Sequence, residues 1–166
     1  MRETNWTPAR QVEGTLVARP GFSVRARTGL GQTLISGDLD AALAALAPGA
    51  RFVGLYGLAP DGPHALRIAP DKALLVTPGP LGAADGWREG WSATSVDDGW
   101  VAVEVEGDGA SLVLMQGTAA DLTAGSPSAA VLFAGRRCLL ARAEAGFRLH
   151  VERPWLEALL TWLDGA

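Results

Sequence analysis

The chain has 166 residues, of which 48% are hydrophobic and 19% are charged, and its formal net charge is −4. A chain of this length forms one domain or two closely fused halves, and it can bury enough surface to be stable without disulfides or structural metal ions. The acidic balance excludes a broad basic field, so we expect neither nucleic acid nor an anionic membrane as a partner.

Residues 1–14 are polar and lack a hydrophobic period, which predicts an N-terminal arm ahead of a single domain over residues 15–166. Trp6 in this arm either anchors on a neighbouring subunit or folds back on its own domain. We expect the domain to consist of two β-α-β halves, approximately residues 15–90 and 91–166.

Alternating residues and turn pairs in the first half predict strands around one helix. Asp38 is placed to cap a helix over residues 38–47, which Pro48-Gly49 ends. Residues 81–91 predict a short helix that their glycines weaken. The predicted strands are 15–18, 22–27, 33–36 and 51–57, followed by a hairpin of 64–69 and 72–77.

Residues 95–122 form the unit around which the predicted domain is organised. The second half of this domain starts with a strand in which apolar and other residues alternate. Glu104 and Glu106 are expected to face water or a partner, while the opposite face is buried and carries Val101, Val103 and Val105.

A helix is predicted directly after this strand. Asp108 is expected to cap a helix over residues 109–116, on which Leu112 and Met115 share one face. Gly117 lies where a helix commonly ends in glycine.

The rest of the chain predicts three strands and a last helix. The strands are residues 129–133, 137–141 and 147–151, and the helix begins at Pro154, where the missing N–H costs nothing. The sum of these elements is an α+β fold with antiparallel sheets and three or four helices.

The histidines and the cysteine favour structural roles. His64 and His150 have no cysteine or paired glutamate at metal-ligand spacing, and His150 alternates with Arg148 and Glu152 on a strand face that is expected to meet solvent. The single cysteine, Cys138, has no disulfide partner, and a buried, inert thiol is the expected state.

The paired carboxylates also favour structural roles. Asp97 and Asp98 precede a glycine, where aspartate commonly forms turns. Glu104 and Glu106 are expected on a wet strand face, whereas an acid–base pair needs one carboxylate in an apolar pocket. The sequence therefore predicts no catalytic, cofactor-binding or metal-binding residue.

Arginine and tryptophan are the two remaining residue types that can build a binding surface. Glutamates lie between the arginines and predict a mixed surface, although these five can face an acidic partner: Arg136, Arg137, Arg142, Arg148 and Arg153. The six tryptophans can stack on a pteridine or flavin ring, but packing in a core or interface is favoured.

Neither a membrane span nor a targeting segment is predicted. No run approaches the roughly 18 apolar residues of a membrane-spanning helix, and the start of the chain lacks the apolar core of a signal peptide. We therefore expect a cytoplasmic location.

Three blocks of sequence, in their order and spacing, resemble the γ subunit of heterotetrameric sarcosine oxidase. The first is ALRIAPDKALLV, residues 65–76. The second lies in residues 95–122 and contains Ser95-Val96-Asp97-Asp98, Gly107-Asp108-Gly109-Ala110 and Asp121-Leu122. The third is a closing helix that ends in Trp162-Leu163. The resemblance extends from near Leu58 to the C-terminus, and more loosely to the helix at 38–47.

The resemblance implies a subunit without a cofactor of its own. The family's enzyme oxidatively demethylates sarcosine to glycine, uses FAD, FMN and NAD, and passes the one-carbon unit to tetrahydrofolate. Its γ chain is understood as a structural subunit packed against the α subunit, beside β and δ chains, with a fold like half of an aminomethyltransferase folate-binding domain. No catalytic residue is carried over to this sequence.

Two hypotheses follow, and an independent enzyme is the third and weakest. The first is a non-catalytic subunit that stabilises an amine oxidase complex dependent on flavin and folate. The second is a self-standing module, monomeric or homo-oligomeric, that binds folate or another one-carbon ligand. Tryptophans and an inward carboxylate such as Asp97 would then hold a pterin.

Overall fold

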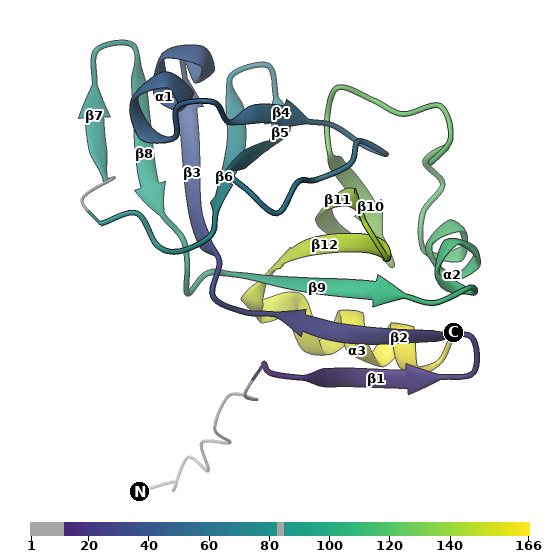
Figure 1. Ribbon diagram of the computed structural model, residues 1–166. Coiled ribbons are helices and arrows are strands. Elements are labelled where there is room, and N and C mark those ends of the chain that lie inside the picture. Colours follow the sequence, from purple (N-terminus) through teal and green to yellow (C-terminus); the bar gives the residue numbers. More distant parts are fainter. Residues whose placement is uncertain (1–11, 83–84) are drawn as a thin grey trace, which may run out of the picture.

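The computed structural model describes residues 12–82 and 85–166, so Trp6 and most of the predicted arm lie outside the described residues. These residues form two six-stranded sheets that pack face to face, with helices on both outer sides (Figure 1). The layers run helix, sheet, sheet, helix, which confirms the predicted α+β class.

One sheet, here called the terminal sheet, is built from the two ends of the described chain. All its neighbouring strands are antiparallel. In spatial order the strands are β1 (Thr15–Arg19), β2 (Phe22–Arg27), β9 (Trp100–Glu106), β12 (Gly146–Glu152), β11 (Arg136–Ala143) and β10 (Ala130–Phe133).

The other sheet, here called the central sheet, is built from the middle of the chain. Its pairs are antiparallel except that of the first two strands, which is parallel. In spatial order the strands are β4 (Arg51–Val53), β5 (His64–Ala69), β6 (Lys72–Thr77), β3 (Gly31–Gly37), β8 (Trp91–Ser95) and β7 (Gly86–Arg88). The predicted hairpin at 64–69 and 72–77 is confirmed.

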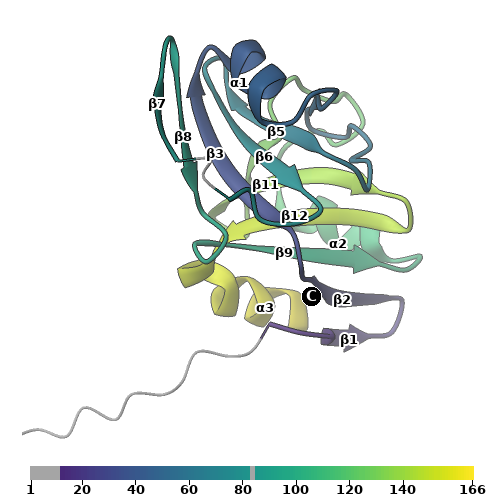
Figure 2. The same ribbon diagram turned by 60° about the vertical axis from the view of Figure 1, so that its left-hand side comes forward.

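Three α-helices cover the outer faces of the sheets in the described residues (Figures 1 and 2). Helix α1 (Leu39–Leu46) packs on the central sheet, and the side chain of Asp38 caps it by accepting a 3.0 Å hydrogen bond from the N–H of Ala41, as predicted. Helices α2 (Ala110–Gly117) and α3 (Leu156–Asp164), the latter preceded by the 3₁₀ turn η1 (Arg153–Trp155), cover the terminal sheet.

The short helix expected in residues 81–91 is wrong. The described part of this segment forms a hairpin of β7 and β8 instead. Gly86 and Gly90 have φ angles of 122° and 83°, values that glycine adopts readily and a helix does not contain. The glycines that weakened the predicted helix are thus the residues that shape the hairpin.

One detail of α2 differs from the prediction. The helix is capped at Gly109 without a side-chain hydrogen bond, so Asp108 is not its cap. Leu112 and Met115 share one face, as predicted; this face is exposed, and the buried residues are Ala110, Val113 and Leu114. The helix has only eight residues, so one narrow stripe is enough to attach it to the sheet.

The two sheets do not coincide with the two predicted halves, residues 15–90 and 91–166. The chain starts in the terminal sheet, crosses to the central sheet at β3, and returns at β9. No helix in the described residues is long and apolar enough to cross a membrane.

Candidate functional site

A cluster of polar side chains lies between the two sheets, where an apolar core would be expected. Four of its members are almost fully buried, and the fifth, Glu104, is partly buried. We call this set the intersheet polar cluster; it consists of Gln32, His64, Glu104, Arg148 and His150. The prediction that His150 and Arg148 face solvent is wrong, because the central sheet covers that face of β12.

His150 is held in one orientation by the side chain of Gln32. The Nδ1 of His150 lies 2.8 Å from Oε1 of Gln32, whose Nε2 donates to the carbonyl oxygen of Trp100 at 3.1 Å. Because the Gln32 oxygen is an acceptor, the imidazole carries its proton on Nδ1. The Nε2 of His150 is then a buried acceptor with no partner in the described residues.

His64 has the same arrangement on the opposite sheet. Its Nδ1 lies 2.8 Å from the carbonyl oxygen of Gly62, and its Nε2 has no partner in the described part of the chain. Burial, together with electrostatic repulsion from His64 and Arg148, lowers the pKa of His150 to about 3. Burial likewise lowers the pKa of His64. Both imidazoles are therefore neutral at pH 7.

Arg148 and Glu104 form an ion pair at the edge of this cluster. The Nε and Nη2 atoms of Arg148 donate to Oε1 of Glu104 at 3.0 and 2.6 Å. The side chains are 4% and 16% exposed, so water screens the pair little. Two weaker ion pairs flank it: Nε of Arg27 lies 4.0 Å from Oε1 of Glu104, and Oδ1 of Asp61 lies 3.9 Å from Nη2 of Arg148. Glu104 is thus not on a wet face, contrary to the sequence prediction, and its carboxylate is engaged.

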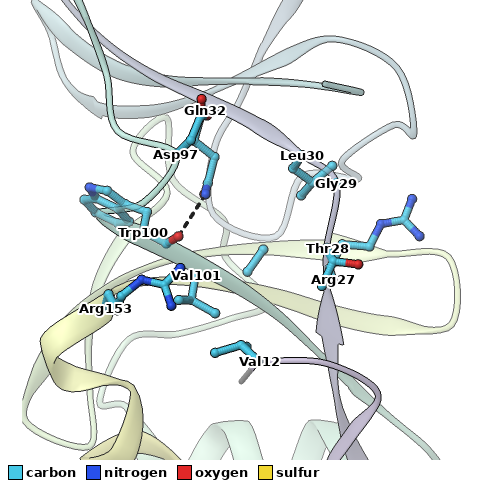
Figure 3. A pocket seen from close by; sticks show the side chains of 11 residues that line it. Val12, Arg27, Thr28, Gly29, Leu30, Gln32, Asp97, Trp100, Val101 and Arg153 are labelled. Carbon is cyan, nitrogen blue, oxygen red and sulfur yellow. Dashed lines mark hydrogen bonds between the residues drawn. The ribbon is translucent and has the colours of Figure 1, made fainter. Parts of the chain in front are cut away.

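Asp97 borders a small cavity next to this cluster (Figure 3). Its carboxylate accepts hydrogen bonds from the main-chain N–H of Gln32 and, at 3.0 Å, from the hydroxyl of Ser95. The cavity has a volume of about 170 Å³, and Trp100 forms part of its wall. Pockets that enclose small molecules usually span roughly 300–1,000 Å³. This cavity is too small for a pterin, and Asp97 serves to join β3 to the turn after β8.

The other predicted site residues are placed as follows. Cys138 is fully buried, as predicted, and burial raises the pKa of its thiol to about 12, which makes it a poor nucleophile. The described residues contain no group of three or more His, Cys, Asp or Glu side chains suited to a metal ion.

The five arginines do not gather into one basic patch. Arg137 pairs with Glu152 at 3.0 Å, and Arg153 donates to the carbonyl oxygen of Asp98 at 2.6 Å. The guanidinium groups of the others are engaged separately: Arg136 over the ring of Trp155, Arg142 over that of Tyr56, and Arg148 with Glu104. An acidic partner would therefore meet no concentrated positive surface.

The described tryptophans are divided between core and surface. Trp91 and Trp100 are buried, and Trp162 packs edge-to-face on Phe133 with ring centroids 5.2 Å apart. Trp155 is 44% exposed and Trp87 is 83% exposed. Trp100 is the only tryptophan that lines the cavity beside Asp97, so that cavity offers no pair of tryptophans between which a flat ring could stack.

A surface that sequence reasoning did not identify lies around β10 and α2. Leu132, Met115 and Leu112 are each more than 60% exposed. Leu132 borders a hollow of about 470 Å³, which is lined by β10, by Leu55 and by residues of the segment 118–126. In the sequence, the only sign of this surface is that Leu132 stands between two apolar residues, Val131 and Phe133. Central strands show the same pattern, so it does not identify an exposed edge.

Comparison with solved structures shows the same fold in a chain of the heterotetrameric sarcosine oxidase from Corynebacterium sp. U-96, solved in complex with pyrrole 2-carboxylate. The TM-score is 0.70 at 22% sequence identity, over 90% of this chain and 85% of that chain. No protein-family model and no curated protein matches the sequence. The likeness concerns the fold, and it extends over nearly all of both chains.

Proposed function

We propose that this protein is a non-catalytic subunit of a heterotetrameric, sarcosine oxidase-like complex and that it stabilises the assembly. In this proposal it corresponds to the γ subunit and packs against an α subunit, beside β and δ chains. The complex would demethylate sarcosine or a related secondary amine in the cytoplasm. FAD, FMN, NAD and tetrahydrofolate would act in the complex and none would be bound by this chain.

The observation that carries the proposal is the extent of the structural likeness. It covers 90% of this chain and 85% of a chain in an oxidase that is itself a heterotetramer. A small shared motif would match only part of either chain. A likeness over nearly all of both chains supports a corresponding place in a corresponding assembly.

The chemistry of the buried polar groups supports a role without catalysis. Asp97, Glu104 and Gln32 have their polar atoms engaged with neighbours in the same chain. The raised pKa of Cys138 disfavours its thiolate. A nucleophile or general base needs a free polar atom that faces a substrate-sized cavity, and these groups are bound to neighbours within or between the two sheets instead. The free Nε2 atoms of His64 and His150 are fully buried.

Co-expression with the α, β and δ chains of the same organism tests the proposal. We expect the four chains to copurify and the complex without this protein to be less stable or fail to form. Assembly and sarcosine turnover that are equal with and without this chain would refute the proposal.

Folate binding by the isolated chain is the alternative that the sequence left open. The small volume of the cavity beside Asp97 argues against it. Calorimetric titration with tetrahydrofolate decides the question: heat that saturates in the micromolar range would support a folate module.

A further inference from the structure

The four outer edges of the two sheets are not equally protected. An exposed edge strand offers unpaired N–H and C=O groups, which proteins usually protect by a cover, a charge, a bulge or a very short strand. Strand β1 has a bulge and lies against α3, with Arg19 paired to Asp164 at 3.0 Å. Strands β4 and β7 have only three residues each, and β7 ends in Arg88.

Strand β10 carries no charge and no bulge, and its own chain covers only the two ends of its outer edge. Its four residues, Ala130 to Phe133, are all apolar, and it is the last strand of the terminal sheet. Its register with β11 is regular, without a bulge. Leu132 in this strand is 69% exposed. A sequence of this kind at an open edge normally requires a partner.

The backbone of β10 leaves hydrogen-bonding groups free at its centre. Hydrogen bonds in an antiparallel ladder point alternately to the two sides of a strand. The N–H groups of Ala130 and Ala134 point outward and donate to Ser128 Oγ and to the carbonyl oxygen of Gly117. Leu132 lies between these two residues and also points outward. Its N–H and C=O have no partner on that side in the described residues.

A groove runs along this open edge. Its volume is about 470 Å³, within the roughly 300–1,000 Å³ that suits an enclosed ligand or a short peptide segment. One wall is Ala130–Leu132 and the other is the segment 118–126, which is rich in small side chains. Asp121 is its only charged residue, and its carboxylate already accepts hydrogen bonds from Thr123 and Ala124. The groove therefore suits an uncharged, extended chain.

We propose that this groove binds an extended apolar segment of a partner subunit, which adds to β10 as a further strand of the terminal sheet. The N–H and C=O of Leu132 would pair with the backbone of that segment, and an apolar side chain would lie against the alanines of the facing wall. Leu132 would be buried at the centre of the contact. This inference rests on the proposed function, since it names the surface that meets the partner.

Leu132→Arg tests the inference in the co-expressed four-chain complex. The charge would lie inside the apolar contact, so we expect the variant to bind its partner chains about tenfold more weakly or worse, the loss typical of a central interface residue. Leu132→Pro is a second variant: it removes the outward N–H and the leucine side chain but keeps the hydrogen bonds of β10 to β11. Trp87→Arg is the matched control: it places the same charge on β7, on the opposite side of the molecule (Figure 1), and should bind as wild type does.

The possible outcomes separate the inference from the proposed function. If the wild-type complex forms and both Leu132 variants, folded by circular dichroism, bind equally well, the inference is overturned and the proposed function stands. If the wild-type complex does not form, both are overturned. If the isolated wild type is a dimer that Leu132→Arg dissociates, the groove takes a second copy, which overturns a partner subunit as its occupant.

Discussion

Single residues between the sheets make the stability of the folded protein sensitive to acid. His150 is buried near Arg148 and His64, and its Nε2 has no partner among residues 12–82 and 85–166. A proton on this imidazole would place a second positive charge beside that of Arg148. The carboxylate of Glu104 already pairs with Arg148, so it would neutralise little of the added charge. The neutral histidines are thus a condition for the two sheets to stay packed.

The stability of the protein should therefore fall in mild acid. The pKa of His150 is about 3 in the folded state and 6.5 as an ordinary value, so the unfolded chain takes up its proton first as the pH falls. The stabilisation is complete above pH 6.5 and is lost as the pH falls toward 3. Each pH unit in this window costs about 1.4 kcal/mol for one histidine, so we expect a loss of about 2 kcal/mol by pH 5, measured by urea unfolding.

The variant His150→Gln is the control for this pH dependence. Its amide can still donate to Gln32, but it does not titrate. The variant should be less stable than wild type at pH 7.5, and its free energy of unfolding should vary less between pH 7 and pH 5. An identical slope in the two proteins would contradict the assignment to His150.

The buried ion pair should be more costly to break than to remove. Glu104→Leu leaves Arg148 buried without its main partner, and loss of one member of a buried pair typically costs about 3–5 kcal/mol. Asp61 lies 3.9 Å away and is 80% exposed, so we expect the lower end of this range. The double variant Glu104→Leu/Arg148→Met should recover most of the loss in urea unfolding; equal losses would show that the pairing is not the cause.

At the scale of elements, short helices are fixed by a few close contacts with the sheets. Helix α2 has no side-chain cap and exposes two of its large apolar residues, so its own sequence stabilises it weakly. Its last residue, Gly117, lies against the ring of Phe133 in β10, and its carbonyl oxygen accepts a 2.7 Å hydrogen bond from Ala134. The end of α2 is thus positioned by the same strand that borders the proposed docking groove.

Gly117→Ala should destabilise the protein, although alanine favours helices by roughly 1 kcal/mol over glycine. A Cβ atom at this position would lie 2.4 Å from two ring carbons of Phe133, which is buried and cannot move away freely. Overpacking of this kind typically costs about 1–3 kcal/mol, so we expect a net loss in urea unfolding. Gly165→Ala, whose Cβ would meet only atoms 3.7 Å away, should be neutral. A gain in stability for Gly117→Ala would show that Phe133 adapts.

At the scale of the whole molecule, neither end of the chain can complete a sheet alone. Strand β9 pairs with β2 on one side and with β12 on the other, so the terminal sheet needs both ends of the chain. The core between the sheets joins side chains of β5 and β6 to those of β11. We therefore expect the described residues to unfold in one cooperative transition.

A fragment of residues 91–166 tests this view of the molecule. It would lose β2 and the entire central sheet apart from β8, which exposes Val103, Leu139 and His150 to water. We expect no cooperative melting of the fragment by circular dichroism. A cooperative transition would show that the second predicted half is an independent folding unit.

Local features of the chain could be predicted from the sequence alone. The bounds of β2, β5 and β6 follow from alternation and from turn pairs such as Pro70-Asp71. The cap of α1 by Asp38 depends on residues three positions apart, and the burial of Cys138 on the apolar residues after it. All these features depend on interactions within a few residues, which the sequence contains in full.

Only the tertiary structure decided which strand faces are dry. In β9 and β12, charged residues and histidine alternate with apolar ones, the pattern of a strand with one wet face. The second sheet covers that face, and its Gln32 holds Nδ1 of His150. Glu104 and Arg148 lie opposite each other on the neighbouring strands β9 and β12 and pair beneath that cover. The open edge at β10 is likewise a property of strand order. The sequence pattern shows which residues of a strand are polar. Whether such a residue is buried, and which group it pairs with, depends on how the sheets pack.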